Sequence, residues 1–197
     1  MVKSSTNSMG MIGIEDQRSK KIIVVSHCIL NQNARIYGIA KFPGVVTPIV
    51  EFLVKNGLGI IQTPCPETTY IGIRRWQYVK EQYDTPAFRE HCRKIATSIL
   101  NQIEDYSNSG YEIIAILGVD GSPSCGVNKT SRNPTWGGLI PKKLPRSEHT
   151  SERGVYMEVL EEEMKKRSLN VPFIGVPENH EMDSLKHTIS QLKQLLT

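Results

Sequence analysis

Long apolar runs are missing from this sequence. No run approaches the roughly 20 residues that cross a bilayer, and the first 20 residues are polar, without the continuous apolar segment of a signal peptide. We therefore predict a cytoplasmic protein with no membrane partner. With 197 residues, 39% of them hydrophobic, the chain is long enough for one full core. We predict a flexible tail over residues 1–19 and one α/β domain over residues 20–197.

Cysteines are few, and none forms a Cys-x-x-Cys pair. The chain has four cysteines, which in a reducing compartment are not expected to form two disulfides. Metal binding or catalysis is therefore considered instead. Zinc sites and redox dithiols usually show the missing pair. Zinc held by three cysteines, a nucleophilic cysteine with His27 or His149 as its partner, an iron–sulfur cluster and scattered structural cysteines all remain open.

Acidic residues are absent from residues 128–147, although the formal net charge of the chain is only +4. The basic residues of this segment are Lys129, Arg132, Lys142, Lys143 and Arg146. Two interpretations are open. The segment is either a solvated loop or a loop whose clustered positive charge attracts phosphate-bearing ligands.

Four short apolar runs alternate with four amphipathic patterns. The runs are rich in β-branched residues and predict buried strands over residues 21–28, 58–65, 111–119 and 171–178. Apolar residues at steps of three and four predict helices over residues 43–56, 86–107, 151–167 and 184–196. This order predicts a single Rossmann-like α/β domain, with a mainly parallel sheet of about four or five strands flanked by helices.

Three cysteines fall at equivalent places in this pattern. Cys28 ends the first predicted strand, Cys65 ends the second, and Cys125 follows the third. Because the carboxyl ends of parallel strands lie on one edge of a sheet, these three thiols are expected to converge there. Cys92 instead falls on the apolar stripe of the helix over residues 86–107, where a free cysteine behaves as a small hydrophobe. We interpret it as a core residue.

The residues that flank two of these cysteines favour a functional site. A proline stands on each side of Cys65, which predicts a rigid exit loop. Gly126 follows Cys125 and is expected to let the backbone approach a bulky ligand closely. The hydroxyl groups of Ser122 and Ser124 can donate to sulfur or to a substrate.

Three motifs at the strand ends resemble a known family. They are Ser26-x-Cys28 with Leu30 and Asn31, Cys65-Pro66-Glu67, and Ser122-Pro123-Ser124-Cys125-Gly126. In this order they resemble the thiouracil desulfurase family over about residues 20–180. The segment KEQYDTPAFREHCRK, followed by GVDGSPSCGV, resembles a divergent branch of iron–sulfur desulfidases. The loops ILNQNARIYG and TTYIGIRRWQY depart from the family pattern, and they are expected to line the substrate pocket.

The resemblance implies a [4Fe–4S] cluster held by Cys28, Cys65 and Cys125. The fourth iron would bind the sulfur of a thiolated pyrimidine and help to remove it as sulfide, in a hydrolytic reaction without net redox change. The expected substrate is a thiouracil or thiouridine-type small molecule, either the free base or a nucleotide. Thiolated RNA is a further possible substrate.

Hydrolysis of a C–S bond needs a group that takes a proton from water. Glu67, which Pro66 fixes two residues after Cys65, is the first candidate for this role. The structural alternative is an ion pair with Arg74 or Arg75. Ser122 and Ser124 could orient the water or donate to the cluster.

Substrate recognition is assigned to the divergent loops. The amide of Asn31 could recognise a pyrimidine edge, and Trp76 offers a face on which a base could stack. Arg74 and Arg75 would suit a phosphate. Two rival functions remain: a non-enzymatic cluster-bearing sensor or RNA-binding module, and a zinc-dependent hydrolase.

Overall fold

A four-stranded parallel sheet forms the centre of the molecule. The computed structural model describes residues 16–138, 146–179 and 181–196. The strands are β1 (Lys21–Ser26), β2 (Gly59–Thr63), β3 (Glu112–Asp120) and β6 (Phe173–Pro177). They pair in parallel in the order β2-β1-β3-β6. The predicted α/β fold with a parallel sheet is confirmed.

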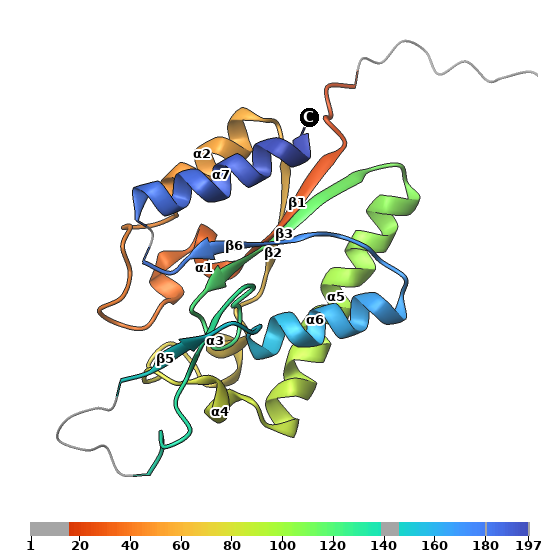
Figure 1. Cartoon of the computed structure of the whole chain (residues 1–197). Helices are drawn as coiled ribbons and strands as arrows, with labels where there is room; N and C mark the ends of the chain where they lie inside the picture. Colours follow the sequence, from red (N-terminus) through yellow and green to blue (C-terminus); the bar gives the residue numbers. More distant parts are fainter. Residues whose placement is uncertain (1–15, 139–145, 180, 197) are drawn as a thin grey trace, which may run out of the picture.

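Helices cover both faces of this sheet (Figure 1). One face packs against α2 (Thr47–Lys55) and α7 (Met182–Leu196), and the other against α5 (Pro86–Asn108) and α6 (Val155–Lys166). Side chains of β1 alternate between the two cores: Ile23 on the α2 side, Val24 on the α5 side. A strand buried on both faces has no polar face, which explains its continuous apolar run.

The winding of the chain changes direction between β1 and β3. From β1 the chain passes through α2 to β2 on one side, and it returns through α5 to β3 on the other. A crevice opens outside the carboxyl ends of two neighbouring parallel strands at such a switch point, and ligands bind in it.

Four long helices agree with the amphipathic patterns to within a few residues. Thr85 caps α5, its hydroxyl oxygen accepting from the Phe88 N–H at 3.2 Å, as the sequence predicts. Gly57, at φ +66°, follows α2. α6 begins at Val155 rather than at residue 151, because Gly154 with extended backbone is its N-cap.

Six short elements fill the two long segments and the loop after β1. They are α1 (His27–Leu30), the 3₁₀ helix η1 (Gln32–Ala34), α3 (Pro66–Tyr70), α4 (Lys80–Tyr83), β4 (Thr130–Arg132) and β5 (Glu148–Thr150). None was predicted, since an element of three to five residues carries no periodicity. β4 and β5 pair antiparallel and form a hairpin beside the carboxyl edge of the sheet.

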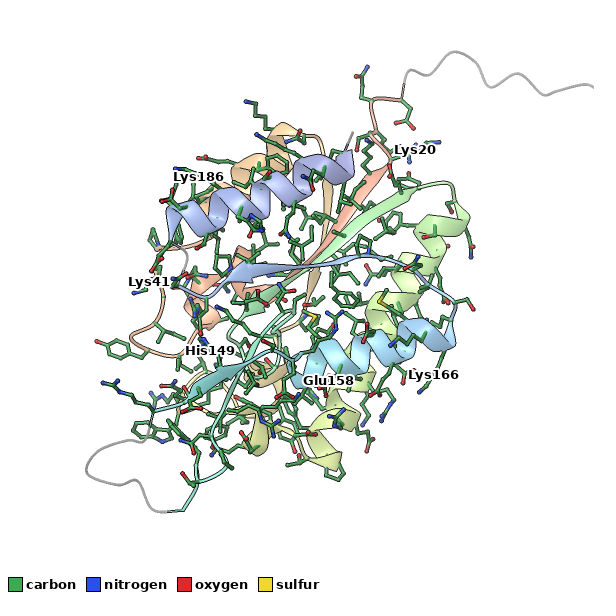
Figure 2. The ribbon with its side chains drawn as sticks, in the orientation of Figure 1. Lys20, Lys41, His149, Glu158, Lys166 and Lys186 are labelled. Carbon is green, nitrogen blue, oxygen red and sulfur yellow. The ribbon has the colours of Figure 1, made fainter. Side chains whose placement is uncertain are left out.

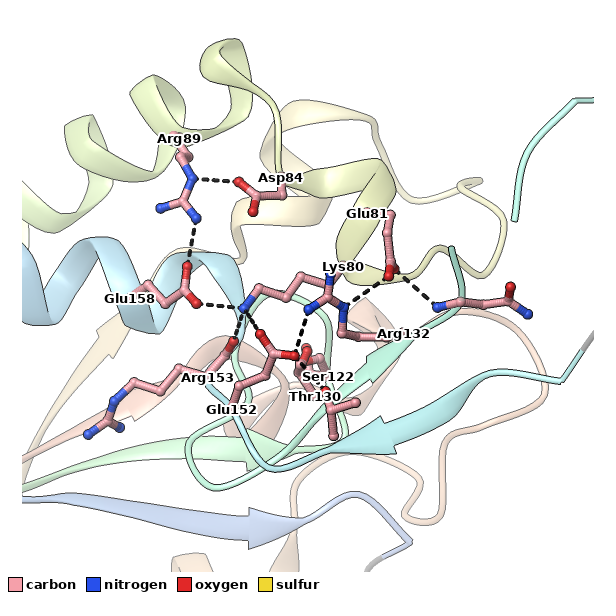
Figure 3. A network of polar contacts seen from close by, with 12 residues as sticks. Lys80, Glu81, Asp84, Arg89, Ser122, Thr130, Arg132, Glu152, Arg153 and Glu158 are labelled. Atoms are coloured by element: carbon pink, nitrogen blue, oxygen red, sulfur yellow. Dashed lines mark hydrogen bonds and ion pairs between the residues drawn. The ribbon is translucent and has the colours of Figure 1, made fainter. Parts of the chain in front are cut away.

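A network of ion pairs fastens this hairpin to the helices (Figure 3). The buried ammonium group of Lys80 on α4 contacts Glu152 at 2.6 Å and also Glu158 on α6. Arg132 on β4 contacts Glu152 at 2.8 Å and Glu81 at 2.9 Å. Arg132 of the basic segment therefore has a structural role.

Some predictions fall outside the described residues. They concern Lys142 and Lys143 of the basic segment and residues 1–15 of the predicted tail. Among the described helices, none is both long and apolar enough to cross a membrane.

Candidate functional site

Cys28, Cys65 and Cys125 line one cavity of about 500 Å³ at the carboxyl edge of the sheet. Cys28 lies in α1, directly after β1, and Cys65 is the N-cap of α3, directly after β2. Cys125 follows β3. Three neighbouring parallel strands thus deliver one thiol each to the crevice at the switch point.

Cys125 is buried, Cys28 and Cys65 are half-buried, and the three thiols are close enough to influence one another electrostatically. Burial raises the pKa of Cys28 to about 12, and Cys65 adds to the shift. Burial, together with Cys28 and Cys65, raises the pKa of Cys125 well above its usual value. Burial and then Glu67 raise the pKa of Cys65. These shifts favour the neutral thiols, and a positively charged centre between the three sulfurs would favour the thiolates instead.

The chemistry of these three donors bears on the kind of centre that fits. Within the described residues, no three His, Cys, Asp or Glu side chains are placed to hold one metal ion. Cysteine thiolates are the usual ligands of iron–sulfur clusters, and a set of three thiols fits such a cluster.

The turn from Ser122 to Gly126 holds Cys125 in place. The backbone N–H of Cys125 donates to the Ser122 hydroxyl oxygen at 3.1 Å, and that of Gly126 donates to the Ser122 carbonyl at 3.1 Å. The Ser124 carbonyl accepts from the Tyr156 N–H at 2.9 Å. The turn therefore occupies the N-terminus of α6, and its position follows that of the helix.

Gly126 has a different role from the one predicted. A Cβ at this position would lie 2.3 Å from the Lys129 carbonyl oxygen and 2.8 Å from that of Ser122. The glycine is therefore required by the close approach of its own chain, and it is not among the residues that line the cavity; its expected role beside a bulky ligand stays a prediction.

Glu67 lies beside the thiols with both carboxylate oxygens engaged. Oε1 accepts from the Ser124 hydroxyl at 2.6 Å, and Oε2 accepts from Arg75 Nε at 2.8 Å. The Ser124 hydroxyl also lies 3.5 Å from the Cys125 sulfur. The ion pair that the sequence offered as an alternative is formed, and it places Glu67 in the wall of the cavity, with Ser122 and Ser124.

Arg75 is buried in the same wall and has a free donor. Its side chain is only 4% exposed, and Nη2 donates to the Ala34 carbonyl at 2.9 Å. Within the described residues, Nη1 has no hydrogen-bond partner. A buried, unpaired guanidinium N–H is costly unless a ligand accepts from it.

The remaining predicted substrate residues separate into two groups. Trp76 lines the cavity and is largely exposed, so its ring is available. Asn31 and Arg74 are not among the residues that line it. The Asn31 side chain instead accepts from the Asn33 N–H at 3.1 Å and caps η1. Cys92 is fully buried in the core beneath α5, as predicted.

Glu178, Asp120 and Lys41 are charged residues of the cavity wall that were not predicted, whereas Arg35 belongs to the loop ILNQNARIYG, which was expected to line the pocket. Glu178 follows β6, and Arg35 follows η1; they form an ion pair at 2.9 Å. A signal was present, because Val176-Pro177-Glu178 repeats at the fourth strand the Pro-Glu step that follows Cys65. His149 on β5, one of the two histidines weighed as a partner for a cysteine, also lines the cavity, whereas His27 is not among its lining residues.

Comparison with known proteins gives one relative and one solved structure. No family model matches the chain. The structure of a [4Fe–4S]-dependent thiouracil desulfidase, TudS, aligns with a TM-score of 0.51 and 18% identity, covering 88% of this chain and 99% of that one. At this identity the likeness shows a common fold.

The relative is the uncharacterized protein MJ0003 of Methanocaldococcus jannaschii. It is 34% identical over 162 residues, which cover 82% of this chain and 89% of the relative. This chain therefore belongs to the same family as MJ0003, and it has the α/β fold of the thiouracil desulfidase.

Proposed function

We propose that this protein is an iron–sulfur-dependent desulfidase that removes sulfur, as sulfide, from a thiolated pyrimidine. The observation that carries the proposal is the meeting of Cys28, Cys65 and Cys125 in one cavity at the switch point of the sheet. The proposed cofactor is a [4Fe–4S] cluster with these three cysteines as ligands. The fold shared with TudS, whose printed name states that dependence, supports it.

The residues around the thiols have proposed roles in a hydrolytic reaction without net redox change. When bound, the cluster supplies a Lewis-acidic iron for the substrate sulfur. Glu67 takes a proton from the attacking water and returns it to the leaving group or to a ring nitrogen. Ser124, which donates to Glu67, holds the carboxylate in position, and Ser122 fixes the turn that carries Cys125.

Two further residues are proposed to bind the substrate. Arg75 lines the cavity, and its buried Nη1 has no partner among the described residues, so we assign this N–H to an acceptor of the bound base such as a carbonyl oxygen. The exposed ring of Trp76 at the cavity wall offers a stacking surface, worth about 1–3 kcal/mol per base.

Anaerobic reconstitution tests the proposal. We expect iron and sulfide to be retained, and sulfide to be released from thiouracil, thiouridine or thiouridine monophosphate. Protein that holds no iron would contradict the cluster assignment. Iron without sulfide release from any of the three compounds would favour a cluster-bearing sensor. Zinc instead of iron, with activity in air, would favour a hydrolase.

A further inference from the structure

Glu178 forms a second carboxylate position in the cavity, on a different strand end from Glu67. Arg35 anchors it twice: Nη1 donates to the Glu178 carbonyl at 3.0 Å, and Nη2 donates to Oε1 at 2.9 Å. The Arg35 side chain is only 5% exposed, whereas that of Glu178 is 33% exposed. A buried guanidinium thus holds a carboxylate whose other end is open to the cavity.

The second carboxylate oxygen of Glu178 has no donor among the described residues. The His149 Nε2 lies 3.9 Å from Oε2, beyond hydrogen-bond distance. Figure 2 labels His149 on the side of the molecule where β3 and β6 end. Oε2 is therefore an acceptor without a donor, in the wall of the cavity that the three cysteines line.

Gly121 keeps this part of the cavity open. A Cβ at Gly121 would lie 2.5 Å from Glu178 Oε2 and 3.1 Å from His149 Nε2. The residue also has φ +96°, which a side chain would strain. Gly121, which directly precedes the Ser122–Gly126 turn, thus makes room for Glu178 and His149, neither of which the proposed hydrolysis uses.

We propose that Glu178 determines substrate specificity by accepting a hydrogen bond from a ring N–H of the substrate. The inference rests on the proposed function. A thiolated pyrimidine carries an N–H beside its C=S group, and an ionised carboxylate can only accept. Arg35 holds the carboxylate in place through the ion pair, and a carboxylate that accepts from an N–H forms a charge-assisted hydrogen bond. The pair therefore selects substrates that retain this N–H, and it rejects N-alkylated and anionic thio-bases.

The first test is a thermodynamic cycle that combines a substitution in the protein with a methyl group on the substrate. For the reconstituted wild type, we expect kcat/KM to fall about 10–100-fold from 4-thiouracil to 3-methyl-4-thiouracil, as is typical of a lost hydrogen bond to a charged group. In Glu178→Ala, the kcat/KM values for these two substrates should differ by less than about threefold. The control Glu181→Ala removes an exposed carboxylate three residues away, and it should keep the wild-type ratio. An undiminished penalty in Glu178→Ala would overturn the inference and leave the desulfidase function standing.

Uracil binding to cluster-free protein separates the inference from the proposed function. We expect calorimetry to show that uracil binds the wild type. Uracil should bind Glu178→Ala at least about tenfold more weakly, and 3-methyluracil should bind the wild type more weakly by the same factor. Such binding without desulfuration would overturn the function and retain the inference. Neither binding nor turnover in the wild type would overturn both.

Glu178→Gln keeps the test valid if loss of the side chain unfolds the protein. Arg35 requires an acceptor, so the amide oxygen would take the place of Oε1 and the amide nitrogen that of Oε2. A donor would then face the substrate N–H. We expect the Gln variant to lose the discrimination as fully as the Ala variant, and a wild-type ratio would contradict the inference.

Discussion

At the scale of single residues, Cys92 and Cys125 show how one side chain serves two purposes. Both are buried in the core between the sheet and α5, but only Cys125 also lines the cavity. Burial raises the pKa of both thiols, that of Cys92 to about 12. They differ in position, because Cys125 adjoins Cys28 and Cys65 at the cavity, whereas Cys92 is not among the residues that line it.

This difference gives the first prediction. Replacement of Cys28, Cys65 or Cys125 by Ala should each abolish retention of iron and acid-labile sulfide after anaerobic reconstitution. Cys92→Ala should retain both, and it should cost about 1 kcal/mol of stability from the small cavity it leaves. Loss of iron in a normally stable Cys92→Ala would show that the ligands are misassigned.

Glu67 gives the second prediction, because replacement by Gln should lower turnover alone, whereas replacement by Ala should also lower the stability of the fold. Glu67→Gln keeps an acceptor oxygen for Arg75 Nε, and its amide N–H can donate to the Ser124 hydroxyl oxygen, so we expect iron to be retained while kcat falls at least about 100-fold. Glu67→Ala leaves the Arg75 side chain buried and unpaired, and it should lower the free energy of unfolding by about 3–5 kcal/mol. Iron assays, kinetics and urea titration measure the three quantities. Near-normal turnover of Glu67→Gln would remove this residue from the mechanism.

At the scale of elements, sequence periodicity predicted the long helices and the strands of the sheet, but it could not predict the helices and strands of three to five residues. The strand that ends at Cys28 was predicted as residues 21–28, whereas β1 ends at Ser26 and Cys28 belongs to the four-residue α1. The convergence of Cys28 with Cys65 could be predicted, because the carboxyl ends of parallel strands lie at one edge of the sheet. The pairing of Arg35 with Glu178 could not be predicted, because it depends on how η1 approaches the end of β6.

The junction between the Ser122–Gly126 turn and α6 gives the third prediction. Gly154 has φ −72°, which any residue adopts, but a Cβ there would lie 2.5 Å from the Ser124 carbonyl carbon. Gly154→Ala should therefore push the turn away from the helix, cost about 1–3 kcal/mol, and weaken iron retention. Gly44→Ala is the matched control: a Cβ there meets nothing within 4 Å, so its effect should stay within about 0.5 kcal/mol. Equal denaturation midpoints for both variants would refute this account.

At the scale of the whole molecule, the site depends on segments far apart in the sequence. Cys65 caps α3, which carries Glu67, whereas Cys125 follows β3 and His149 lies on β5. The ion-pair network around Lys80 holds α4, the β4–β5 hairpin and α6 together (Figure 3). We therefore expect these ion pairs to keep the β4–β5 hairpin, and with it His149, in place at the cavity wall.

The acid response of this network gives the fourth prediction. The hydrogen bond from Lys80, assisted by Arg132, lowers the pKa of Glu152 from its usual 4.5 to about 2. Since the pKa is lower in the folded state, the stabilisation is present above about pH 4.5, and it is lost as the pH falls towards 2. With the Glu152 side chain 31% exposed, we expect this contribution to be about 1–2 kcal/mol after allowance for solvent screening.

Urea titrations of wild type and Lys80→Met between pH 7 and pH 2.5 measure this contribution. The variant should be less stable at pH 7, and the gap should narrow by about 1–2 kcal/mol across the acid range, because protonated Glu152 no longer needs the ammonium group. Lys94→Met, which removes an exposed i,i+4 pair with Glu90, should change stability by at most about 0.5 kcal/mol and show no such narrowing. A constant gap for Lys80→Met would mean that the Lys80–Glu152 contact does not stabilise the fold through the charge of Glu152.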